Sequence, residues 1–105
     1  MKRVVVTGLG LVTPLGCGVE QNWSNLISGL SGGVKISKFD PTNFKCKVAC
    51  EVQLGSASDG KFNPEEWIEK KEIKKIDEFI QFSMAASEQA FRDSKIEITN
   101  NLSLR

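Results

Sequence analysis

Three cysteines are the strongest nucleophiles in this 105-residue sequence, and no histidine accompanies them. Cys17 follows the first hydrophobic run, whereas Cys46 and Cys50 lie four residues apart in the second. A cysteine nucleophile needs a base or a positive charge close by to form its thiolate, and the histidine count is zero. The chain therefore offers no imidazole to these thiols.

The same cysteines make neither a metal site nor a disulfide framework. Without histidine, three thiolates would need a fourth ligand from elsewhere to hold zinc, so no metal site is predicted. An odd count leaves one thiol over. On a regular strand the α-carbons of Cys46 and Cys50 would lie about 13 Å apart, too far for a bridge. We expect three small, buried apolar side chains in a reducing, cytoplasmic location.

The pair Gly8 and Gly10 follows a β-branched run and precedes a helix, which is the setting of a dinucleotide-binding turn. The third glycine of that motif would fall at Thr13, and Pro14 interrupts before any helix begins. No acidic residue ends the second strand to hold a ribose hydroxyl. The sequence favours a tight glycine turn packed against the sheet and predicts no cofactor. A small dinucleotide-binding domain remains the weaker alternative.

Lys71, Lys74 and Lys75 form a basic cluster at i, i+3 and i+4 spacing, which places them on one face of a helix. A cluster of this kind is most often a solvated surface, because the surrounding segment 61–78 also holds many acidic side chains. The nearest carboxylates lie off the lysine face or at its end. We therefore expect these three ammonium groups to be incompletely paired.

Glycine and proline residues that break secondary structure, together with the hydrophobic periodicity, define the elements that must position these side chains. A nearly continuous apolar run predicts a strand buried on both faces at about residues 3–13. Strict alternation predicts a second strand, with one polar face, at about 44–54. Helices are predicted at about 19–28, 64–76 and 77–93.

The three predicted helices differ in their signals. The helix at 19–28 should bury one face, made of Trp23, Leu26 and Ile27. The helix at 64–76 begins with a capping asparagine, a first-turn proline and two acids. The helix at 77–93 is apolar over most of its circumference. We expect either that a partner chain covers this helix, or that the helix is exposed and the isolated chain self-associates.

The composition argues against several classes of protein. The formal net charge is +1, which leaves no overall field to attract nucleic acid or an anionic membrane. No stretch approaches the roughly 20 apolar residues that cross a bilayer, and the opening valine run is too short for a signal peptide. A chain of 105 residues forms one domain at most. We expect no nucleic acid and no membrane among its partners.

The opening sequence Lys2-Arg-Val-Val-Val-Thr-Gly-Leu-Gly-Leu-Val-Thr-Pro-Leu-Gly16, followed by Val19-Glu-Gln-Asn-Trp23, resembles the amino terminus of a β-ketoacyl-acyl carrier protein synthase. The type II bacterial form of this condensing enzyme is the most similar. The resemblance recurs at Ser31-Gly32-Gly33, at Phe39-Asp40 and over Lys70–Gln81, and so spans nearly the whole chain.

The resemblance implies an α/β, thiolase-like fold, of which residues 1–105 would form an incomplete amino-terminal portion of one synthase domain. The family's enzymes are several times longer. They carry out the decarboxylative Claisen condensation of an acyl thioester with malonyl-acyl carrier protein in fatty acid elongation. Their nucleophilic cysteine lies in a Thr-Ala-Cys-like context that would fall beyond residue 105, and two histidines assist it, so the resemblance implies that none of this chain's residues is catalytic. The family uses no metal or nucleotide and generally forms homodimers.

Two further expectations follow from the resemblance. The basic cluster with which the family meets acyl carrier protein maps position by position onto Lys71, Lys74 and Lys75. The family usually has glycine after Asp93-Ser94, where this chain has Lys95, so we expect the helix cap there to differ. The alternative to an enzyme part is a non-catalytic fragment of a truncated or split gene that binds carrier protein or a partner, and this chain alone is expected to be inactive.

Overall fold

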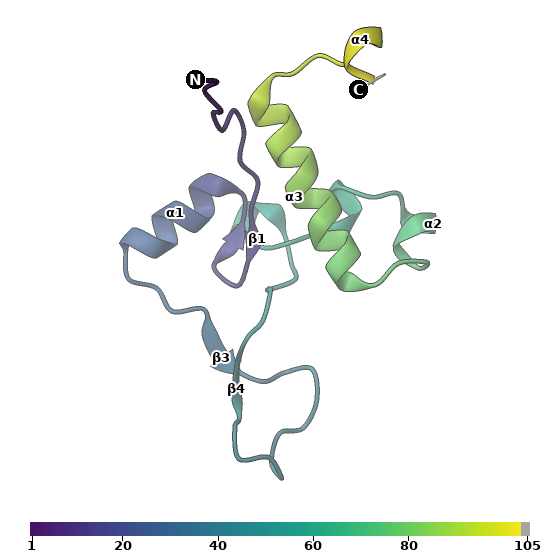
Figure 1. The fold of residues 1–105 in the computed structure, drawn as a ribbon. Helices are drawn as coiled ribbons and strands as arrows, with labels where there is room; N and C mark the ends of the chain where they lie inside the picture. The colour runs from purple at the N-terminus through teal and green to yellow at the C-terminus, as the bar shows by residue number, and fades with distance from the viewer. Residues whose placement is uncertain (104–105) are drawn as a thin grey trace.

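A computed structural model describes residues 1–103 as a set of short elements around one long helix (Figure 1). The strands form two antiparallel hairpins, β1 with β2 and β3 with β4. The elements in chain order are β1 Val12–Thr13, β2 Gly16–Cys17, α1 Val19–Ile27, β3 Gly33–Lys35, β4 Val48–Cys50, the 3-10 turns η1 Ala57–Asp59 and η2 Pro64–Glu66, α2 Lys70–Ile73, α3 Glu78–Ser94 and α4 Asn100–Ser103.

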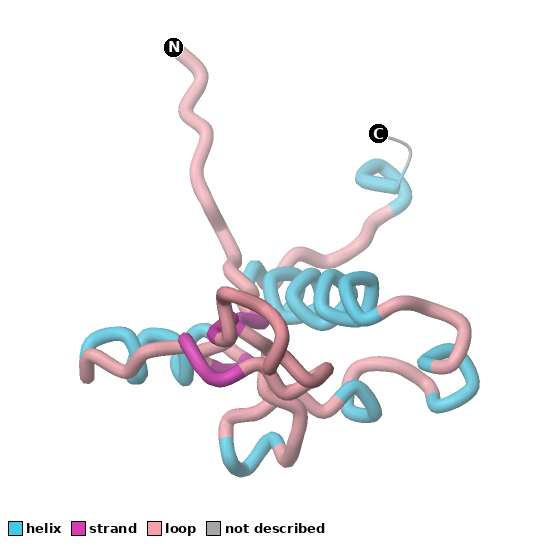
Figure 2. Tube along the Cα trace, turned by 90° about the horizontal axis from the view of Figure 1, so that it is seen from below, coloured by secondary structure: helices cyan, strands magenta, loops and turns pink. Residues whose placement is uncertain are grey.

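The strand predicted at 3–13 is mostly not a strand in this structure. Only its end pairs, as β1. The residues just before β1 are extended beside α3, and the amino terminus lies away from the body of the molecule (Figure 2). The backbone N–H of Leu9 donates to Asp93 Oδ2 and that of Leu11 to Gln89 Oε1, each at 3.0 Å. Four helical residues rise about 6 Å and two extended residues about 6.7 Å. Side chains one helical turn apart can therefore bind alternate amides of the extended segment.

The second predicted strand, 44–54, is shorter than expected. It is reduced to β4, which pairs with β3 in the register Gly33↔Cys50, and to an isolated bridge between Leu54 and Phe62. The alternation predicted one buried face, but Val48 is 59% exposed and Leu54 56% exposed. The prediction of a buried face is wrong for this chain, because no second layer covers the two-stranded hairpin within residues 1–103.

Helix α1 confirms the position of the predicted helix at 19–28, but it buries a different side. Its single buried side chain is Asn22, whereas Trp23, Leu26 and Ile27 are all more than half exposed. The Asn22 amide donates to the carbonyls of Gly16 and Gly18 and its oxygen contacts the Thr13 hydroxyl. The helix is thus attached to the β1–β2 hairpin by hydrogen bonds rather than by its apolar face.

The helix predicted at 64–76 is broken in two. Asn63 caps η2 as expected, its side chain accepting from the Glu65 N–H at 3.1 Å. The helix then stops, because Ile68 turns inward to 6% exposure and Trp67 packs toward the body. Between this break and residue 76, where the predicted helix was to end, only the four residues Lys70–Ile73 of α2 are helical. Helix α3 confirms the long helix predicted at 77–93.

The core is small. Its buried apolar side chains are Phe62, Ile68 and Ala85, and the Phe62 ring meets that of Phe82 edge-on at 5.2 Å. The radius of gyration is 17.0 Å, whereas a compact domain of this length has about 13 Å. Large apolar side chains of α1, α3 and the amino-terminal segment remain exposed. In the described part of the chain, no helix combines the length and hydropathy needed to cross a membrane.

Candidate functional site

The predicted docking lysines lie on α2 and the turn that follows it, residues 70–76, which we call the lysine turn. Lys71 is in α2, Lys74 ends it and Lys75 comes next. All three side chains are exposed. They lie on one short turn rather than along a continuous helix, so the helical face inferred from the sequence is shorter than predicted.

Gln81 of α3 holds this turn in place, and the sequence analysis did not identify it. Its side chain is 8% exposed, and Nε2 donates to the carbonyl oxygens of Ile73 at 3.4 Å and Ile76 at 3.3 Å. Ile73 is the last residue of α2, where helix carbonyls lack a partner within the helix, and Ile76 lies in the bend before α3. The sequence shows only a glutamine within a largely apolar helix pattern, and its burial becomes visible in the structure.

The lysines are better paired than their spacing suggested. Lys71 Nζ lies 3.1 Å from Glu69 Oε2, and Lys75 Nζ lies 3.4 Å from Glu72 Oε1. The expectation that neighbouring carboxylates lie off the lysine face is therefore wrong for two of the three, and among residues 1–103 only Lys74 of this set has no ion pair. Exposed pairs of this kind contribute about 0–1 kcal/mol, so a partner could replace them.

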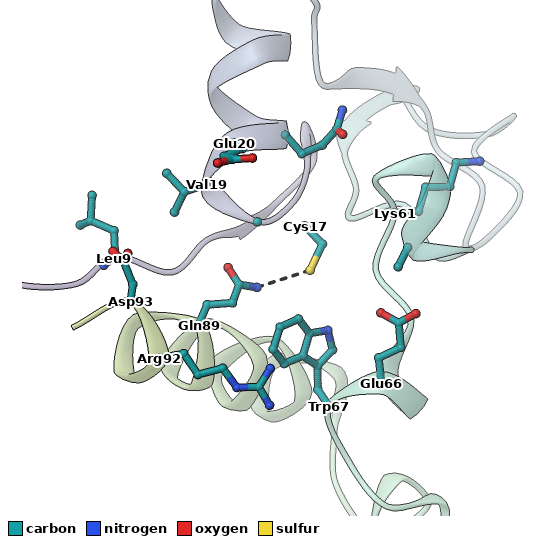
Figure 3. A pocket seen from close by; sticks show the side chains of 13 residues that line it. Leu9, Cys17, Val19, Glu20, Lys61, Glu66, Trp67, Gln89, Arg92 and Asp93 are labelled. Carbon is teal, nitrogen blue, oxygen red and sulfur yellow. Dashed lines mark hydrogen bonds between the residues drawn. The ribbon is translucent and has the colours of Figure 1, made fainter. Parts of the chain in front are cut away.

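A cavity of about 620 Å³ lies beside Cys17, between the start of α1, the second half of α3 and residues 57–67 (Figure 3). Gln89 Nε2 donates to the Cys17 sulfur at 3.4 Å. Burial raises the pKa of the Cys17 thiol, and this effect outweighs the lowering by the Gln89 hydrogen bond, while the Glu66 carboxylate adds a smaller rise. The thiol therefore stays protonated at neutral pH, which makes it a poor nucleophile.

The wall of this cavity is built by Trp67 and Arg92. The guanidinium carbon of Arg92 lies 5.5 Å from the centre of the Trp67 ring, and its Nε donates to Glu88 Oε1 at 2.9 Å. The indole Nε1 of Trp67 is buried and has no hydrogen-bond partner within residues 1–103. Stacking and ion pairing fix these side chains as packing groups around the thiol, and none of them is positioned as a base for it.

The other two cysteines do not behave as predicted. Cys46 and Cys50 are exposed rather than buried, because β4 belongs to a hairpin without a covering layer, and Cys17 is only half-buried. All three thiols are free. Within residues 1–103, no three of the cysteine, aspartate and glutamate side chains come close enough to hold a metal ion.

The glycine pair packs against a helix rather than forming a turn beside the sheet. A Cβ at Gly8 would lie 2.2 Å from the Ala90 carbonyl oxygen, and one at Gly10 would lie 1.9 Å from that of Ala86. Glycine is needed because the extended backbone touches the backbone of α3 directly. A bound phosphate needs the amino-terminal end of a helix, whereas these glycines contact the carboxyl-terminal half of α3.

Comparison with known proteins identifies the family. The family model described as "Beta-ketoacyl synthase, N-terminal domain" matches residues 1–104. The chain belongs to the β-ketoacyl synthase family. It has a partial form of the family's thiolase-like α/β fold, as the resemblance implied.

Three relatives illustrate the match. The chain is 44% identical over 94 residues to the 3-oxoacyl-[acyl-carrier-protein] synthase 2 of Rhizobium meliloti (strain 1021), covering 90% of this chain and 22% of the relative. It is 43% identical over 104 residues to the enzyme of the same name from Vibrio harveyi, covering 99% and 23%. Among solved structures, the ishigamide ketosynthase/chain length factor matches with a TM-score of 0.72 at 31% identity, covering 93% of this chain and 22% of that one. This β-ketoacyl synthase chain thus spans less than a quarter of the length of the relatives it matches.

Proposed function

We propose that this chain is the amino-terminal part of a 3-oxoacyl-[acyl-carrier-protein] synthase of fatty acid elongation. The observation that supports the proposal is the family match across residues 1–104, together with relatives that carry this name over 90–99% of the chain. In the proposed reaction, malonyl-carrier loses carbon dioxide and the resulting carbanion attacks an acyl group held as a thioester on an enzyme cysteine. The new carbon–carbon bond forms as the carbon–sulfur bond breaks and the thiolate leaves.

The chain's own contribution to this reaction is structural. It has no histidine, and its half-buried cysteine has a raised pKa and lies against glutamine and tryptophan. The chain therefore provides neither a thiolate nucleophile nor an imidazole that could donate to a developing oxyanion. We assign the catalytic groups to the part of the synthase that this sequence does not include.

The test of this assignment is a condensation assay. The 105-residue chain, given acyl-carrier and malonyl-carrier, should form no ketoacyl product above a blank. The same chain co-expressed with the remaining part of the Rhizobium meliloti relative should restore product. Turnover by the chain alone that disappears in C17A would contradict the proposal.

The lysine turn is proposed to meet the acyl carrier protein. Lys71, Lys74 and Lys75 are exposed, and their ion pairs are of the weak surface kind. Reversing all three to glutamate should slow association with the carrier at low salt, and the effect should shrink at high salt, because charges at the rim of an interface act mainly on association rate. Unchanged affinity at low salt would show that this turn is an ordinary solvated surface.

A non-catalytic binding module remains the second candidate. It is favoured by the large apolar side chains that the chain leaves exposed, Phe79, Met84 and Phe91 of α3 among them. The co-expression experiment separates the candidates, because a binding module would form a complex without restoring product.

A further inference from the structure

The hairpin of β3 and β4 with its connecting loop, residues 33–50, carries a cluster of mostly unpaired positive charge, and we call it the finger. It holds four lysines and one acidic residue, Asp40, for a net charge of 4 − 1 = +3. Lys38 forms an ion pair, but the remaining three, Lys35, Lys45 and Lys47, form none within residues 1–103. The lysine turn, by contrast, is mostly paired.

The tip of the finger is an ordered turn that presents two aromatic rings. Asp40 Oδ1 accepts from the Thr42 N–H at 3.1 Å and from the Thr42 hydroxyl, and the Phe44 N–H donates to the Pro41 carbonyl at 2.9 Å. The rings of Phe39 and Phe44 pack edge-to-face with centroids 5.4 Å apart, yet remain 52% and 58% exposed. Exposed aromatic pairs on a fixed turn are typical of interaction surfaces.

The connecting loop of the finger is anchored to the start of α3, which follows the lysine turn in the chain. Lys38 Nζ pairs with Glu78 Oε2, and Glu78 is the first residue of α3, three positions after Lys75. On the other side, the Ser37 N–H and hydroxyl both donate to the Glu51 carboxylate. The connecting loop of the finger, just before its tip, is thereby tied to the first residue of α3. The hairpin itself extends away from the rest of the molecule (Figure 1).

We propose that the finger is a second docking surface for an acidic protein partner that has an apolar recess. This inference rests on the proposed function and takes the partner to be the acyl carrier protein. The free lysines Lys35, Lys45 and Lys47 steer an acidic surface toward the chain, and Phe39 and Phe44 enter its recess. A net charge of +3 confined to one hairpin is suited to short-range complementarity with a protein. It does not provide the long run of phosphate contacts on which nucleic-acid binding depends.

The test measures binding of a fluorescently labelled acyl carrier protein to the 105-residue chain by anisotropy, at low and at high salt. Reversing the free charges in K35E/K45E/K47E should weaken binding about tenfold at low salt, with a smaller effect near 1 M salt, where the Debye length is about 3 Å. F39S/F44S should weaken binding by a similar factor at both salt concentrations. The matched control K2E/R3E/K61E changes the net charge equally, at exposed residues outside the finger, and should change affinity less than twofold.

The outcomes separate this inference from the function on which it rests. Binding that is lost in K71E/K74E/K75E but unchanged by reversal of the finger overturns the inference and leaves the proposed function standing. Absence of carrier binding by the wild-type chain contradicts both. Equal weakening by the finger and control variants would reduce the effect to net charge and overturn the inference. If a single-stranded oligonucleotide or anionic phosphatidylserine vesicles bind more tightly than the carrier protein, and reversal of the finger charges weakens that binding, the inference is also overturned. Far-UV circular dichroism of each variant confirms that only surface groups have changed.

Discussion

At the scale of single residues, Gly10 has the strictest requirement. A Cβ there would lie 1.9 Å from the Ala86 carbonyl oxygen and 2.9 Å from the Ala90 nitrogen, both of which are helical backbone atoms that cannot rotate aside. Gly10→Ala must therefore push the extended segment away from α3. We expect a loss of about 3 kcal/mol or more in the free energy of unfolding, at the upper end of overpacking effects, measured by urea unfolding with tryptophan fluorescence.

The control for this prediction is Gly33→Ala. The nearest neighbours of a Cβ at Gly33 are Ser31 Oγ at 3.4 Å and Val48 Cγ1 at 3.7 Å, which are ordinary or slightly tight contacts with side chains. Gly33→Ala should change the urea midpoint little. Equal midpoints for the two variants would show that the contact between Gly10 and α3 is not formed in solution.

Cys17 gives a second residue-scale prediction, based on its raised pKa. Burial disfavours the thiolate, so the fraction of reactive thiolate at pH 8 is lower for Cys17 than for an unperturbed thiol. In the native chain, iodoacetamide should modify the exposed Cys46 and Cys50 first and Cys17 last, as read by mass spectrometry of peptides. Denaturation should equalise the three rates, and fast labelling of native Cys17 would contradict the buried thiol.

The same shift fixes the sign of a pH effect on stability. Because the folded pKa of Cys17 is raised above its unfolded value, the folded state holds the proton more tightly. The stabilisation is fully present below the unfolded pKa and is lost as pH rises toward and through the folded pKa. Cys17→Ser should remove this alkaline loss of stability, because serine does not titrate in the range.

The polar residues that position the backbone could not be predicted from the sequence. Asn22, Gln81 and Gln89 each donate to or accept from groups whose closeness depends on the finished fold. Local periodicity carries no information about such distant partners. The absence of imidazole groups, by contrast, can be read directly from the sequence, because its histidine count is zero.

At the scale of elements, the end of α3 retains a left-handed cap although the residue there is lysine. Lys95 has φ 56° and ψ 25°, and its N–H donates to the Arg92 carbonyl. The expectation that the cap geometry differs is therefore wrong, because the termination of α3 fixes the backbone whatever the side chain. A non-glycine residue in this conformation costs about 1 kcal/mol.

Lys95→Gly should consequently raise the free energy of unfolding by up to about 1 kcal/mol, by removing the contact between Cβ and backbone. The gain is partly offset by the greater freedom of glycine in the unfolded chain. Lys95→Ala keeps the strain but removes the ammonium group, so it should not stabilise the protein. Paired thermal melts of the two variants give the measurement, and a stabilising alanine would assign the effect to charge instead.

Elements with strong local signals were predictable, and those determined by tertiary contacts were not. Helices α1 and α3 occur within one or two residues of their predicted bounds, because capping and periodicity are local. The helix at 64–76 failed because burial of Ile68 overrides its helical propensity. The strand at 3–13 failed because pairing needs a neighbour, and a hydrophobic run does not show whether that neighbour is present.

At the scale of the whole molecule, the decisive fact is how little the chain covers of its own apolar surface. In the amino-terminal segment, Val4, Val5 and Val6 are 94%, 64% and 79% exposed. Within the described residues, the backbone of residues 2–8 makes no hydrogen bond. A continuous apolar strand of this kind is normally paired on both edges and covered on both faces. The lone chain should therefore be marginally stable or self-associating.

This surface leads to a prediction that compares the chain alone with the chain in a complete synthase. Backbone amides without partners exchange with solvent as fast as in an unfolded peptide, whereas those in a central strand are protected. In the lone chain at low concentration, we expect the amides of Val4, Val5 and Val6 to exchange without protection. Co-expressed with the remaining part of the Rhizobium meliloti relative, they should exchange at least about a hundredfold more slowly. The amide of Ala85, buried in α3, serves as the internal reference, since its helical hydrogen bond forms in both states. Slow exchange at the valines in a lone monomer would show that the chain already completes this strand by itself. Fast exchange in the reconstituted complex would show that its partner surface lies elsewhere.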